Sequence, residues 1–67
     1  MIRNEQELAV TRERVASFEH MLEELRKTAR PEEWRELSSG YRAEIERMQR
    51  EILDYLVQPR RKTTGQV

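Results

Sequence analysis

The chain has 67 residues, enough for one small domain whose core is too small to make it comfortably stable alone. It contains no cysteine and one histidine, which excludes disulfides and thiolate metal sites and leaves a partner as the expected support. Thirteen basic residues cancel thirteen acidic ones, so net charge gives no argument for nucleic acid or a membrane surface. No apolar run approaches the roughly 20 residues that span a bilayer, and the charged start does not resemble a signal peptide, so we expect a cytoplasmic protein.

The first predicted element is a helix whose apolar residues recur every three or four positions. They are Leu8, Val15, Phe18, Leu22, Leu25 and Ala29, with Thr11 in the one gap. This spacing predicts a continuous apolar stripe along one helix. Its start has two alternatives. Asn4 caps a helix of about 4–28, with Glu7 at a capping-box-like spacing, or Thr11 caps a helix of about 11–28.

A proline then interrupts a run of strong helix formers. Pro31 suits the first turn of a helix, but it excludes the preceding Arg30 from helical geometry. The sequence therefore predicts that the first helix ends near Thr28 and that residues 29–30 form a turn. A connection this short makes the two helices antiparallel neighbours.

The second predicted helix covers about 31–57 and carries a broader stripe than the first. The stripe comprises Trp34, Tyr41, Ile45, Met48, Ile52 and Tyr55, with Ser38 in the one polar slot and Leu37 and Leu56 at its edges. Gly40 lies opposite the stripe, where glycine costs about 1 kcal/mol relative to alanine. It is either a tolerated weak point or a place where a partner approaches closely.

Folding about residues 29 and 30 pairs positions whose numbers sum to 59 or 60. Phe18 then meets Tyr41, and Val15 meets Ile45, so the two stripes agree in register. The predicted fold is all-α, an antiparallel, coiled-coil-like two-helix hairpin over residues 1–58. At its open end we expect Met1, Ile2 and Leu8 to lie beside Leu53, Leu56 and Val57.

Two helices alone cannot cover two apolar stripes. Completing the burial of about a dozen large side chains is worth on the order of 10 kcal/mol, comparable to the stability of a small domain. We therefore expect two hairpins to form a homodimeric four-helix bundle, or one hairpin to bind a helical partner protein. The predicted core and interface residues are Leu8, Val15, Phe18, Leu22, Leu25, Trp34, Leu37, Tyr41, Ile45, Met48, Ile52, Tyr55 and Leu56.

The N-terminal segment MIRNEQELAVTRERVASFEHMLEEL and the segment YRAEIERMQREILDY at 41–55 together resemble a group of small bacterial proteins. Many of these are antitoxin-like transcriptional regulators, in which a helical hairpin precedes a helix-turn-helix DNA-binding domain. The residues that carry the resemblance in the first segment are Asn4, Glu5, Thr11, Phe18, Leu22 and Leu25. The resemblance implies an association module from a regulator or antitoxin context, without the domain that reads bases.

No residue pattern indicates catalysis. His20 has Glu23 and Glu24 at helical spacing, which could hold a weak surface metal, but a solvated histidine is the ordinary reading. Paired glutamates need a pocket to act as acid and base, and a hairpin offers none. We predict no enzyme, no cofactor, no metal and no small-molecule substrate.

The last segment, PRRKTTGQV, follows the second helix. Pro59 stops that helix, and residues 59–67 hold too few apolar groups to fold, so a disordered basic tail is expected. Arg60, Arg61 and Lys62 could contact phosphates with salt-sensitive, sequence-blind affinity. An alternative function is therefore a small nucleic-acid-binding accessory protein that acts through this tail.

Overall fold

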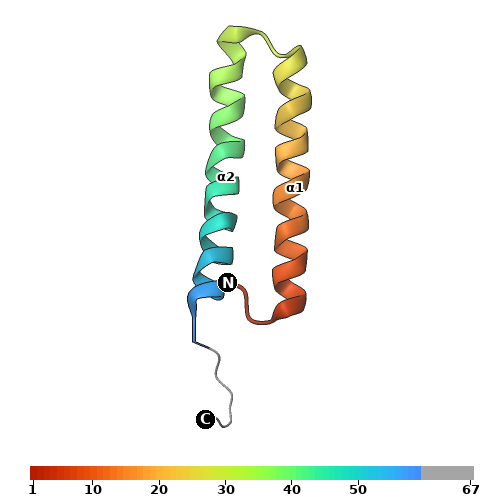
Figure 1. The fold of residues 1–67 in the computed structure, drawn as a ribbon. Helices are drawn as coiled ribbons and strands as arrows, with labels where there is room; N and C mark the ends of the chain where they lie inside the picture. Colours follow the sequence, from red (N-terminus) through yellow and green to blue (C-terminus); the bar gives the residue numbers. More distant parts are fainter. Residues whose placement is uncertain (60–67) are drawn as a thin grey trace.

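The computed structural model describes residues 1–59. They form two helices, α1 (Glu5–Thr28) and α2 (Pro31–Val57), and contain no strand. The helices run side by side in opposite directions, joined at one end by a short turn (Figure 1). The predicted all-α helical hairpin is therefore confirmed.

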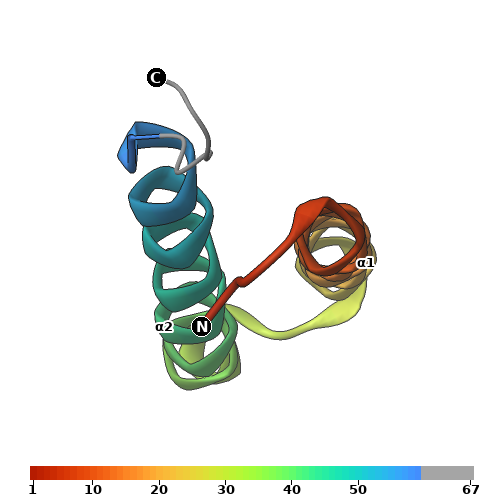
Figure 2. The ribbon, with the colours of Figure 1, turned by 90° about the horizontal axis from the view of Figure 1, so that it is seen from below.

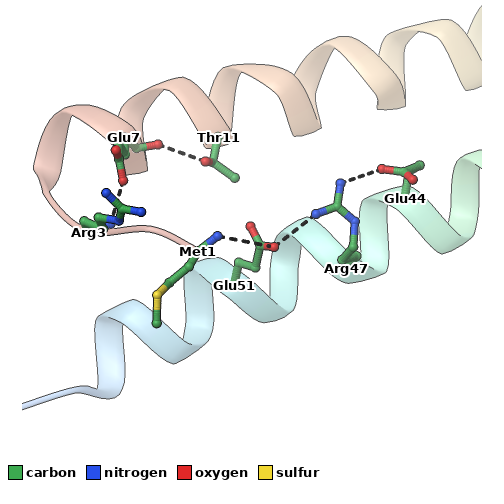
Figure 3. A network of polar contacts seen from close by, with 7 residues as sticks. All are labelled: Met1, Arg3, Glu7, Thr11, Glu44, Arg47 and Glu51. Atoms are coloured by element: carbon green, nitrogen blue, oxygen red, sulfur yellow. Dashed lines mark hydrogen bonds and ion pairs between the residues drawn. The ribbon is translucent and has the colours of Figure 1, made fainter.

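Helix α1 begins at the asparagine cap rather than at Thr11. The Asn4 Oδ1 accepts a hydrogen bond from the Glu7 N–H at 2.8 Å. The Glu7 carboxylate in turn accepts one from the Arg3 N–H at 2.7 Å. Thr11 lies inside the helix, where its hydroxyl donates to the Glu7 carbonyl at 2.9 Å (Figure 3). A threonine bonded to the preceding turn in this way cannot act as an N-cap.

The turn consists of two extended residues before the proline. Ala29 and Arg30 have φ near −74° and −73° and ψ near 147° and 150°. The Ala29 N–H still donates to the Leu25 carbonyl at 2.8 Å, which closes α1. Pro31 occupies the first position of α2, as predicted, because its ring fits there and forces Arg30 out of helical geometry.

The core lies between the helices. Val15, Ile45 and Met48 are buried together, and three half-buried side chains pack against them: Phe18, Leu22 and Ile52. The Phe18 and Tyr41 rings meet edge to face with their centroids 5.6 Å apart. This pair is the one that the predicted register brings together.

The first four residues form an arm that folds back from α1 toward α2 (Figure 2). Ile2 is only 6% exposed, and the Met1 ammonium lies 3.8 Å from a Glu51 carboxylate oxygen (Figure 3). The arm does not cover the apolar residues at the end of α2, because Leu53, Leu56 and Val57 are 60%, 52% and 69% exposed. Glu51 and Leu53 are two positions apart and point to different sides of the helix, so an arm held at Glu51 leaves Leu53 uncovered.

Candidate interaction surface

Burial divides the hairpin into two halves. We call the half that contains the helix ends opposite the turn the open half. Every buried side chain among residues 1–59 lies in it: Ile2, Leu8, Val15, Ile45 and Met48. Residues 16–44 form the turn half, and none of them is buried. The turn half nevertheless holds Phe18, Trp34 and Tyr41, all of them half-buried. Its largest apolar side chains are therefore incompletely covered.

One side of the hairpin, the arm-side face, combines exposed apolar residues with charges. An open groove beside the arm is lined by Val10 and Arg14 of α1 and by Arg47 and Glu51 of α2, so these residues share one side. Positions three or four apart continue the same side along each helix. The face so defined comprises Val10, Arg14, Ser17, Met21, Glu24 and Thr28 on α1, and Glu33, Leu37, Gly40, Glu44, Arg47 and Glu51 on α2.

Three apolar side chains of this face remain exposed in the hairpin. Val10, Met21 and Leu37 are 47%, 42% and 40% exposed. Met21 lies at the seam between the helices, since its sulfur accepts a hydrogen bond from the Tyr41 hydroxyl at 3.7 Å. Met21 thus adjoins Tyr41, one of the half-buried aromatic residues of the turn half.

Ion pairs arrange the charges of the face near the arm. Arg47 donates to Glu44 at 2.7 Å and to Glu51 at 3.0 Å, and Glu51 also meets the Met1 ammonium (Figure 3). The hydrogen bond to Glu44, together with its negative charge, raises the pKa of the Arg47 guanidinium. Arg14, which lines the same groove, forms no side-chain hydrogen bond or ion pair with residues 1–59. Its charge is available to a partner.

The opposite side of the hairpin differs in composition. Arg42 and Glu46 form an ion pair at 2.9 Å there, and the hydrogen bond raises the pKa of Arg42. Leu53 continues this line seven positions after Glu46. The apolar residues on this side are confined to the end of α2, at Leu53, Leu56 and Val57. This side therefore offers a small terminal patch rather than a continuous apolar surface.

The thirteen predicted core and interface residues fall into three groups. Buried are Leu8, Val15, Ile45 and Met48; half-buried are Phe18, Leu22, Leu25, Trp34, Tyr41, Ile52 and Tyr55; exposed are Leu37 and Leu56. Their role in an interface stays a prediction. The predicted interface does not include Met21 and Val10, because both lie outside the apolar stripe among polar residues. Met21 follows Ser17 by four positions and Val10 precedes Arg14 by four, and this helical spacing could have placed them on one face.

The structure supports neither of the two other sites considered from the sequence, the basic tail and His20. The basic residues Arg60, Arg61 and Lys62 lie outside the described residues. His20 is exposed, and within residues 1–59 no three potential ligands gather closely enough to hold a metal ion. Neither described helix is long and apolar enough to cross a membrane.

Comparison with known proteins identifies no relative. No family model, no curated protein and no solved structure matches this chain.

Proposed function

We propose that this chain is a non-enzymatic association module in which two copies of the hairpin pair to form a four-helix bundle. The observation that carries the proposal is the turn half, which contains Phe18, Trp34 and Tyr41 but has no buried side chain between residues 16 and 44. Aromatic side chains of this size contribute most when they are removed from water completely. A second hairpin supplies the missing surface.

The expected affinity follows from the burial that remains to be completed. The incompletely buried apolar residues of the turn half are Phe18, Met21, Leu22, Leu25, Trp34, Leu37 and Tyr41. Covering what each leaves exposed contributes on the order of 0.5 kcal/mol per side chain, or several kcal/mol for a pair of chains. Association itself costs about 4 kcal/mol or more. Seven such side chains on each of two chains contribute about 7 kcal/mol, which leaves about 3 kcal/mol after the cost of association. This balance corresponds to a weak dimer with a dissociation constant in the millimolar range.

The same surface would accept helices of a different protein, and the resemblance to antitoxin-like regulators motivates that form of the proposal. In such a setting the hairpin would supply association within a bacterial regulatory system. Self-association is the simpler form of the proposal, because it needs only this hairpin.

The test is the mass in solution, measured by light scattering and sedimentation equilibrium from about 0.1 to 10 mM, a range that brackets a millimolar constant. The expected result is a shift from one chain to two across this range. Emission from Trp34, the single tryptophan, should move to shorter wavelength over the same concentrations as its environment becomes drier. A folded single chain at the highest concentration would contradict the proposal.

A further inference from the structure

On the basis of the proposed self-association, we infer that the second copy binds the arm-side face, reversed end to end, with the two-fold axis passing beside Gly40. A closed two-fold pair places the same surface on both copies, so that surface must complement itself. The arm-side face can complement itself in three respects: the open site at Gly40, the order of its charges, and the position of the arm at its end.

The arm already shows that this face accepts a third segment. It buries Ile2 to 6% exposure on this side of the hairpin, in the open half. Farther toward the turn the same face has no cover, and Met21 and Leu37 remain 42% and 40% exposed. A second hairpin therefore continues the layer that the arm begins.

Charges on α1 complement each other when the helix meets its own reversed copy. In that arrangement Arg14 faces Glu24 of the other chain, and Ser17 faces Met21, because these positions are symmetric about residue 19. Arg14 makes no ion pair within the described hairpin, and Glu24 has only an exposed pair with Lys27 at 3.5 Å. Arg14 of each chain would thus form an ion pair with Glu24 of the other chain, which gives two ion pairs related by the two-fold axis.

Charges on α2 complement each other in the same reversal. Symmetry about Gly40 places Glu33 opposite Arg47 of the other chain and brings the two Gly40 backbones together. A side chain at Gly40 would meet nothing within 4 Å in the single hairpin, so the site is open toward the partner. Glycine at such a crossing allows close approach of two helices.

One rotation satisfies both helices. Residues at one level of the hairpin have numbers that sum to 59, as Phe18 and Tyr41 show. The symmetric positions, residue 19 on α1 and Gly40 on α2, also sum to 59, so they lie at the same level and on a single axis. Nothing in either helix alone requires this agreement.

The boundaries of the face fit the reversed pair as well. Position 51 of one copy falls opposite position 29 of the other, so the partner's turn ends where the arm begins, at Glu51. Two hairpins with their turns at the same end would instead bring the two arms together at one level. The reversed arrangement avoids this overlap.

The experiment is a charge exchange followed by sedimentation equilibrium. We expect Arg14→Glu alone and Glu24→Arg alone each to weaken the dimer by about tenfold or more, because each creates two like-charge contacts per pair. Arg14→Glu with Glu24→Arg should restore the dissociation constant to within about threefold of the original. The matched control is Arg12→Glu, the same change two positions earlier and away from this face.

The outcomes separate this inference from the proposed function. A single chain at every concentration would overturn both. A dimer that the single exchanges do not weaken, or that the double exchange does not restore, would overturn the reversed arm-side arrangement and leave self-association standing. Helix content by circular dichroism verifies that each variant is folded.

Discussion

The two halves of the hairpin bury their side chains to different extents, although the same two helices build both. In the open half, Leu8, Val15, Ile45 and Met48 are each less than 9% exposed. In the turn half, larger aromatic residues reach only partial burial. The open half has a third segment, the arm with Ile2, whereas the turn half has only two helices. The arm adds a packed segment only near the open end, because the cluster of Val15, Ile45 and Met48 is covered by Phe18, Leu22 and Ile52 of the two helices. Burial in this chain therefore depends on where a side chain lies along the hairpin and not only on its hydrophobicity.

The largest expected effect breaks the core of the open half. Met48→Ala removes a side chain that is 3% exposed and should lower the free energy of unfolding by about 2–5 kcal/mol, since it leaves a cavity among Val15 and Ile45. Met21→Ala is the matched control, because it deletes the same atoms from a position that is 42% exposed. Urea unfolding of dilute protein, followed by circular dichroism, compares the two variants. Equal losses would remove the distinction between the halves.

The next effect concerns association through the turn half. Met21→Glu combined with Leu37→Glu should weaken the dimer by about a hundredfold, because four carboxylates would enter one apolar interface. Leu53→Glu makes the same change on the opposite side, at a residue that is 60% exposed, and should leave the dimer unchanged. Sedimentation equilibrium measures both constants. Dissociation by Leu53→Glu alone would move the interface to the end of α2.

A substitution at the N-cap of α1 should change the stability of the open half and leave the turn half unchanged. Asn4→Ala removes the acceptor for the Glu7 N–H and should cost about 1 kcal/mol, whereas Asn4→Asp keeps an oxygen in place and should cost little. Amide hydrogen exchange should rise in the arm and the first turn of α1. Trp34 emission should stay unchanged at a fixed degree of association. A shift of that emission would show that the halves are coupled.

The smallest effect has opposite signs for folding and association. Gly40→Ala should stabilise the single hairpin by about 1 kcal/mol, because alanine favours the helix and its methyl group meets no atom within 4 Å. The same methyl group should weaken the dimer where two copies cross at this residue. Unfolding of dilute protein gives the first quantity, and sedimentation equilibrium gives the second. Stronger association of Gly40→Ala would contradict the crossing.

The hairpin itself was predictable from local rules. Pro31 fixes where the chain reverses, and the phases of the two stripes then place Phe18 against Tyr41, as the structure has them. The start of α1 was left open, because Asn4 and Thr11 are both good caps by residue type. Two hydrogen bonds distinguish them: Asn4 Oδ1 accepts one from the Glu7 N–H, and the Thr11 hydroxyl donates one to the Glu7 carbonyl in the preceding turn.

The candidate surface was less predictable, because it depends on where the arm lies. Periodicity identifies the face that each helix turns toward the other, but it does not tell to which side of α2 the first residues cross. The arm lies with Ile2 buried and with Met1 beside Glu51, and it leaves Leu53 exposed. The exposed position of Met21 was not predictable for the same reason. It indicates an interaction surface only when the position of the arm shows which side of the hairpin can bind a further segment.

The turn has a practical consequence for experiments. No residue among 1–59 has a positive φ, so neither Ala29 nor Arg30 requires a glycine-like conformation. Since the chain lacks cysteine, a single Arg30→Cys substitution would provide a unique attachment point for a spin label without backbone strain. In a dimer the two labels would lie far apart if the hairpins are reversed end to end, and close together if their turns are at the same end. One distance measurement by electron paramagnetic resonance would therefore distinguish the two arrangements.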